Sequence, residues 1–205
     1  MQLVPRLAIT LAIPMLAACG VQHQNVRLST PETRVNPAEG KPIVVAAVTD
    51  SRKTPDGATF AQGERTHNVG GVWRGGNGVA VDLGQDTVIE ETREIVTQAL
   101  RGMGYRVLAE GVASPDAPRV AINITQFDVD APFNFWRAAS YTQQMVADVG
   151  TDIEVKSGGS AQSFKATGHG TNIYQRVVPE NWEAALNEAI AEYTKQFQSK
   201  MGRIE

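Results

Sequence analysis

The sequence predicts an α+β fold: a small, mainly antiparallel sheet with two amphipathic helices packed on one face. Residues 87–103 and 179–201 each repeat apolar side chains at three- and four-residue steps, which is typical of a helix with one buried stripe. Residues 141–156, beginning with Tyr141, alternate apolar and polar side chains, which is typical of a strand with one wet face. The predicted order along the chain is strand, helix, strand, strand, strand, helix.

The length and composition fit one folded domain. The chain has 205 residues, of which 42% are apolar and 20% are charged. Its net charge is −3, so it lacks the basic excess of nucleic-acid binders, and we expect no nucleic-acid partner. Because Cys19 is the only cysteine, an internal disulfide, a CxxC redox pair and a cysteine zinc cage are excluded.

Residues 1–18 predict a lipoprotein signal peptide. Arg6 precedes an apolar run that is too short to span a bilayer permanently and that ends in small residues. The segment Leu16-Ala17-Ala18-Cys19 resembles the bacterial lipobox, and this resemblance implies cleavage before Cys19 and acylation of its thiol. The membrane is then a partner through that lipid, and Gly20 at the next position favours the periplasmic face of the outer membrane by analogy with enterobacterial sorting. The alternative is an ordinary buried cysteine after a plain signal peptide.

Residues 19–41 predict a lipidated N-terminus and a flexible tether, because polar residues, prolines and a glycine interrupt any apolar period there. The single α+β domain is expected over residues 42–205. Its first element is the apolar, β-rich segment 42–48, which is typical of a strand buried on both faces. The glycine-rich segment 53–84 predicts a long loop, with a loose hairpin around residues 68–81.

The first helix has clear ends. Thr87 and Glu90 have the spacing of a capping box at its start, and Gly104 supplies the stop at its end. A short strand over residues 105–108 follows, and then a longer one over residues 119–130.

The second half of the chain predicts two more strands and the last helix. The apolar phase of residues 119–130 changes near Thr125 and Gln126, where a bulge would keep Phe127 in the core. Residues 131–139 are expected to be a connector. A tight turn at 157–160 leads into a strand that ends near residue 174, and the last helix begins near Pro179.

Several short motifs follow one another in a fixed order. They are the lipobox, Asp50-x-Arg52 after the first strand, Gly104-Tyr105-x-Val107 after the first helix, Val120-x-Ile122-x-Ile124, the alternating strand 141–156, the strand to Tyr174 and the last helix. Over about residues 42–200 this arrangement resembles the YajG-type family of bacterial lipoproteins. The family has no established biochemical activity, so the resemblance implies a location and a fold more than a function.

Asp50 and Arg52 follow a buried strand, where they form either a ligand contact or a local ion pair. Trp73 and Arg74 lie among glycines in residues 70–76, which form either a loop that docks on a partner or a passive one. That loop lacks the ending of a P-loop and the spacing of a dinucleotide motif, so no nucleotide is expected.

Three aromatic residues, Phe133, Phe135 and Trp136, lie close together in the expected connector. If they are exposed, they form an apolar patch of the kind that marks a partner or membrane contact. Otherwise they cap the core between two strands.

The histidines and carboxylates show no spacing that builds a metal site or a catalytic triad. We therefore expect no catalytic residue, no metal, no cofactor and no enzymatic activity. The predicted function is that of an outer-membrane lipoprotein whose periplasmic domain is an accessory or binding protein for an envelope protein. The alternative is a periplasmic module that binds a small ligand or cell-wall material, suggested by Lys165 and His169 on the wet strand face.

Overall fold

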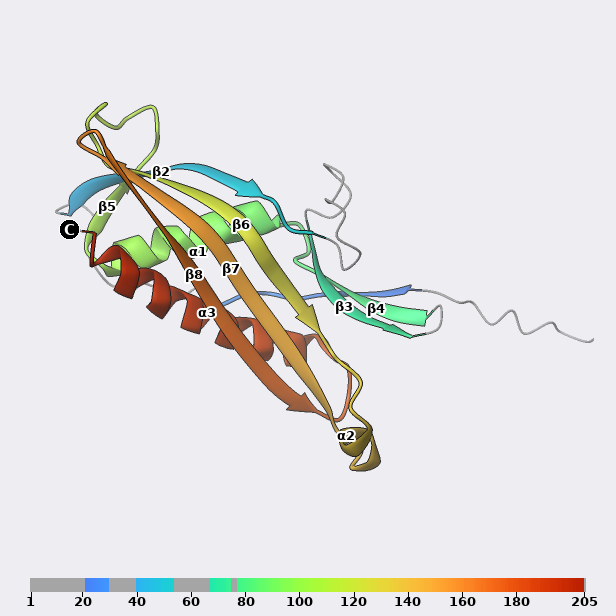
Figure 1. Cartoon of the computed structure of the whole chain (residues 1–205). Coiled ribbons are helices and arrows are strands. Elements are labelled where there is room, and N and C mark those ends of the chain that lie inside the picture. The colour runs from blue at the N-terminus through green and yellow to red at the C-terminus, as the bar shows by residue number, and fades with distance from the viewer. Residues whose placement is uncertain (1–20, 30–39, 54–66, 75–76, 205) are drawn as a thin grey trace, which may run out of the picture.

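The computed structural model describes residues 21–29, 40–53, 67–74 and 77–204, without the side chains of residues 73, 74 and 77 (Figure 1). These residues form one eight-stranded sheet and three helices. The strands are β1 (Val21–Asn25), β2 (Lys41–Asp50), β3 (Asn68–Arg74), β4 (Asn77–Asp82), β5 (Tyr105–Leu108), β6 (Arg119–Asp130), β7 (Gln143–Ser157) and β8 (Ser160–Tyr174). The helices are α1 (Val88–Gly102), α2 (Phe135–Ala139) and α3 (Pro179–Met201).

The predicted fold class, a small and mainly antiparallel sheet with two helices, is wrong. The sheet is large and mixed, with the order β1-β4-β3-β6-β2-β5, and β7 joins β6 on one side and β8 on the other. β2 runs parallel to both β5 and β6, β3 runs parallel to β6, and β1 runs parallel to β4. Parallel partners lie far apart in the sequence, so the alternation within one segment does not reveal them. The additional helix that was not predicted, α2, lies in the segment expected to be a connector.

β2 and β3 share one edge of β6, end to end. β2 pairs with residues 119–124 of β6, and β3 pairs with residues 129 and 130. On the other edge, β7 follows β6 with a register shift between Ile124 and Gln126, which confirms the predicted bulge. The bulge keeps Phe127 in the core, where it has no exposed surface.

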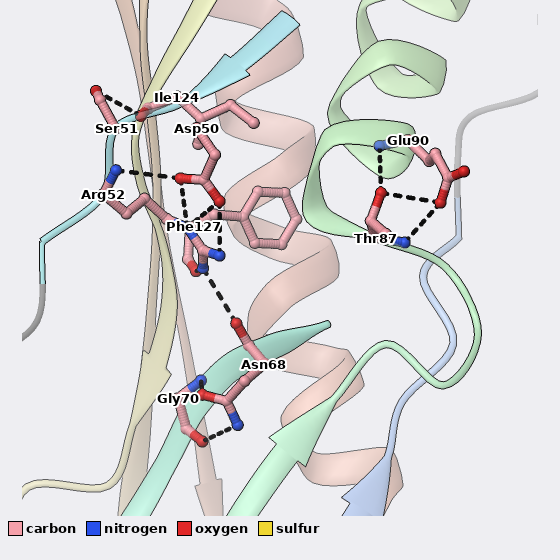
Figure 2. Close-up of polar contacts among 9 residues, drawn as sticks. All are labelled: Asp50, Ser51, Arg52, Asn68, Gly70, Thr87, Glu90, Ile124 and Phe127. Carbon is pink, nitrogen blue, oxygen red and sulfur yellow. Dashed lines mark hydrogen bonds and ion pairs between the residues drawn. The ribbon is translucent and has the colours of Figure 1, made fainter. Parts of the chain in front are cut away.

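α1 and α3 lie on the same face of the sheet and contact each other (Figure 1). α1 packs mainly on β2 and β5, and α3 packs mainly on β8 and β7. The capping box at Thr87 and Glu90 is confirmed, with both reciprocal bonds formed at 2.9–3.1 Å (Figure 2). Gly104 follows α1 with a φ of 87°, as the predicted stop requires.

The glycines of β8 let α3 approach very closely. A methyl group at Gly168 would overlap the carbonyl oxygen of Ala189, and one at Gly170 would overlap that of Ala185. Close approach brings polar side chains of α3 onto the outer edge of β8, where they accept backbone N–H groups. Thr171 donates to Glu188 at 2.7 Å, His169 to Glu192 at 2.8 Å and Thr167 to Gln196 at 3.3 Å. The helix thus covers an edge strand that would otherwise be open to strand pairing.

The predicted flexible tether over residues 19–41 is wrong for residues 21–29. Residues 21–25 form β1, and Val26 lies in the core with 2% of its surface exposed. The amides of Arg27 and Ser29 each donate at 2.8 Å to side chains of α3. These contacts are all made with segments distant in sequence, so the polar local composition did not indicate them.

The predicted signal peptide, Cys19 and residues 30–39 lie outside the described residues. Among the described helices, none is both long and apolar enough to cross a membrane.

Candidate functional site

Arg52 closes the junction where β2 and β3 meet along β6. Its side chain is 5% exposed and binds both carboxylate oxygens of Asp50, with Nε 3.0 Å from Oδ1 and Nη2 2.9 Å from Oδ2 (Figure 2). Nη1 donates to the backbone oxygen of Phe127 at 2.8 Å and to that of Asn68 at 3.2 Å. The two predicted site residues therefore form a local ion pair that joins three strands.

Beside this junction, the sheet face opposite α1 and α3 is hollowed. One hollow of about 740 Å³ lies between residues 51–53 (after β2), β3, β6 and β7, and an adjoining hollow of about 540 Å³ extends across β2, β6, β7 and β8. Asn123 and Asp152 line both, so we treat them as one feature, the sheet groove. Its polar lining includes Arg52, Lys53, Gln126, Asp128, Asp130 and Lys165.

A row of ionisable side chains crosses three strands at one end of the sheet groove. Asp128 of β6 pairs in register with Asp148 of β7, which pairs with His169 of β8. Nδ1 of His169 lies 2.8 Å from Oδ1 of Asp148, and this hydrogen bond raises the pKa of the imidazole. Burial, reinforced by the negative charge of Asp148, raises the pKa of Asp128 to about 6.

This arrangement suits the binding of a polar ligand. Amides and carboxylates offer both donors and acceptors, and Asp128 can bind in either protonation state near neutral pH. No group of three or more His, Cys, Asp and Glu side chains in the described part of the chain could hold a metal ion.

The aromatic residues of the predicted connector form an exposed protrusion. Phe133 is 65% exposed, Phe135 67% and Trp136 80%. Oδ1 of Asn134 caps α2 by accepting the backbone N–H groups of Trp136 and Arg137 at 3.1 and 3.2 Å. The rings of Phe135 and Trp136 meet edge to face, with centroids 5.6 Å apart. The interpretation that these residues cap the core is therefore wrong for their side chains.

Two more exposed apolar residues lie near this protrusion, and the sequence did not reveal them. Tyr141 is 87% exposed with a φ of 57°, and Ile173 is 58% exposed. The alternation suggested that Tyr141 belongs to the buried face of a strand, but β7 starts only at Gln143. A turn closed by the Tyr141 N–H and the Ala138 oxygen, 3.1 Å apart, directs the chain out of the strand pattern.

The side chains of two predicted site residues, Trp73 and Arg74, cannot be placed relative to the sheet groove. Trp73 and Arg74 end β3, where their backbones pair with Gly78 and Asn77, and their side chains fall outside the description. Asp128 and Asp148 could not be recognised as neighbours from the sequence, because only the register of β6 and β7 places them opposite each other.

Comparison with known proteins does not assign a family. No family model matches the chain, so membership of the YajG-type family is not shown. None of the curated proteins matches it either.

Two solved structures share some geometry with the chain. One is described as an uncharacterized protein, with a TM-score of 0.48 and 10% identity over 89% of this chain and 99% of that one. The other is lipoprotein GNA1162 from Neisseria meningitidis, with a TM-score of 0.36 and 6% identity over 79% of this chain and 98% of that one. Both scores are too low for the fold or the function of either protein to be transferred.

Proposed function

We propose that this chain is a lipid-anchored, non-enzymatic binding protein of the bacterial cell envelope, and that it binds a small polar ligand in the sheet groove. The observation that carries the proposal is the groove itself. Its two adjoining hollows, of about 540 and 740 Å³, lie in the size range of small-molecule sites. The lipobox ending in Cys19 supports anchoring in the envelope, with the periplasmic face of the outer membrane as the proposed location.

The polar side chains of the lining, set beside apolar surface, can bind a ligand that carries hydroxyl and amide groups, such as a fragment of the cell wall. Asn123 lines both hollows, and its side-chain oxygen accepts from the hydroxyl of Thr49 at 3.1 Å. Gln126 and Asp128 lie on the same wall. Such groups hydrogen-bond to sugars and peptides without needing a strong opposite charge.

The test is a titration of the full chain, purified in detergent, with muropeptides, followed by NMR chemical shifts and calorimetry. We expect saturable shifts that gather at Asn123, Gln126 and Asp128, and binding at least tenfold weaker in Asn123→Ala. The matched control, Gln162→Ala, changes an exposed residue of β8 outside the groove and should bind normally. Absence of any saturable shift would overturn the small-ligand proposal.

A second candidate occupant is an extended peptide of an envelope protein. The groove crosses β2, β6, β7 and β8, and this length suits an extended chain as well as a compact ligand. Photo-crosslinking in cells from position 126 distinguishes the two. A discrete adduct with one envelope protein, together with no response to muropeptides, would favour this second candidate.

A further inference from the structure

Exposed aromatic residues gather at one end of the molecule, around α2. Phe133, Phe135, Trp136 and Tyr141 are each about two-thirds exposed or more, and they are contributed by the short segment between β6 and β7. Folded domains rarely expose so many large apolar side chains together unless something covers them.

The strand registers place the start of β1 at this same end of the sheet. β3 runs parallel to β6, and Gly71 pairs with Asp130, the last residue of β6, so the rest of β3 extends beyond that strand. Trp73 pairs with Gly78, and Gly78 pairs with Val21, the first residue of β1. α2 also follows the end of β6, so β1 begins at the end of the sheet from which α2 projects.

Figure 1 agrees with this placement. α2 and the β3–β4 end lie away from the C-terminus and from the turn between β7 and β8. In this view, α2 and the β3–β4 end both lie on the same outer side of the described domain. One flat surface can therefore touch both of them.

The lipid anchor of the proposed function would lie at this end. Two peptide units join Cys19 to Val21, and they span at most about 7 Å. Because β1 is paired with β4 from its first residue, there is no long linker between an acylated Cys19 and the folded domain. With Cys19 acylated, this end of the domain would therefore be held against the bilayer surface.

We propose that the aromatic residues of α2 enter the interfacial layer of the membrane in which Cys19 is anchored. This inference rests on the proposed lipidation of Cys19. Tryptophan and tyrosine have an apolar ring and a polar group, and they favour the boundary between headgroups and acyl chains. Arg137, on the same helix, adds a positive charge that anionic headgroups attract. The domain then has two membrane contacts, which fix its orientation and hold the turn between β7 and β8 away from the bilayer.

The test uses protein purified from cell membranes and labelled with a fluorophore on a single introduced cysteine, bound to vesicles of phosphatidylethanolamine and phosphatidylglycerol. Trp136→Cys carries the label in one sample and Tyr141→Cys in a second, which guards against a local effect of one substitution. The control is Val112→Cys, because Val112 is 78% exposed and lies between β5 and β6 at the opposite end of the sheet. Lipids with quenchers on their acyl chains report the depth of each label, and mass spectrometry of the same samples reports the lipid on Cys19.

With Cys19 acylated, we expect quenching at positions 136 and 141 to exceed that at position 112 several-fold, with a blue-shifted emission. Equal, weak quenching at the three positions in acylated protein would overturn the inference and leave the anchor intact. Shielding of position 136 only after envelope proteins are added would overturn it in favour of a protein partner. Protein without a lipid on Cys19 would refute the anchor itself, and with it this inference.

Discussion

The guanidinium of Arg52 lies 2.8 Å from the backbone oxygen of Phe127, between the part of β6 that pairs with β2 and the part that pairs with β3. Because β2 and β3 pair with different parts of the same edge of β6, the backbone groups of β6 between these parts lack a partner strand on that edge. Arg52 satisfies the Phe127 carbonyl there, and Asp50 balances its charge. The Asp50-x-Arg52 motif is thus a structural device that shapes the wall of the sheet groove.

We predict that Arg52→Ala lowers the free energy of unfolding by about 3–5 kcal/mol, because it leaves the Asp50 carboxylate without its positively charged partner and two backbone oxygens without their donor. Denaturant unfolding followed by circular dichroism measures this loss. The control Lys53→Ala changes an exposed neighbour and should alter stability by less than about 0.5 kcal/mol. Equal effects of the two substitutions would show that the junction does not depend on Arg52.

Asp128 should make stability depend on pH. Its folded-state pKa of about 6 is above the ordinary value of 3.8, so its contribution is fully present below about pH 4 and is lost as pH rises through about 6. Asp128→Asn removes this loss, and the variant should gain stability relative to the natural chain between pH 4 and pH 8. The gain is at most about 3 kcal/mol, and solvent access to the groove reduces it.

The comparison requires unfolding curves of both proteins across this pH range. Asp148→Asn should lower the pKa of Asp128, since the charge of Asp148 contributes to raising it, and carboxyl NMR titration measures that change. A stability difference that stays constant from pH 4 to pH 8 would contradict the assignment.

Gly168→Ala should destabilise the packing of α3 on β8. The added methyl group meets the backbone of α3 at Ala189 and Tyr193, and backbone cannot move aside as a flexible side chain can. We expect a loss of about 1–3 kcal/mol or more, as for other overpacked cores. Gly111→Ala places the same group in open space and is the matched control. Thermal unfolding of the two variants checks this, and similar midpoints would argue against the close approach.

Removing the acceptors on α3 should expose the edge of β8. In the double variant Glu188→Ala and Glu192→Ala, the N–H groups of Thr171 and His169 lose their partners. We expect self-association through this edge, detected by analytical ultracentrifugation, because unpaired edges template strand pairing. Glu180→Ala, in the first turn of the same helix, should remain like the natural chain. A double variant with an unchanged sedimentation profile would show that the edge is protected in another way.

Local signals in the sequence predicted local structure well. The capping box of Thr87 and Glu90, the bulge before Phe127 and the start of α3 near Pro179 each depend on residues a few positions apart. The sheet as a whole was not predictable in this way. β1 is held in place by its pairing with β4 and by contacts of the following residues with α3. The residues of Val21–Asn25 show no apolar–polar alternation that would predict a strand.

The same distinction between local signals and contacts of distant segments applies to the candidate site. The exposure of Phe133 and Trp136 was one of two interpretations, and the structure decides between them because α2 projects beyond the end of β6. The neighbourhood of Asp128, Asp148 and His169 follows from two strand registers. Periodicity shows that these residues share a wet face, but it does not show which of them are adjacent.

The lipid on Cys19 is tested most directly by growing cells with an alkyne analogue of palmitate and analysing the purified chain and its Cys19→Ala variant. We predict that the natural chain incorporates the analogue, and that mass spectrometry places it on an N-terminal Cys19 from which residues 1–18 have been removed. The Cys19→Ala variant should incorporate none and retain its N-terminal segment. A natural chain that is cleaved elsewhere, or that carries an unmodified Cys19, would contradict the lipid anchor on which both the proposed location and the membrane contact of α2 depend.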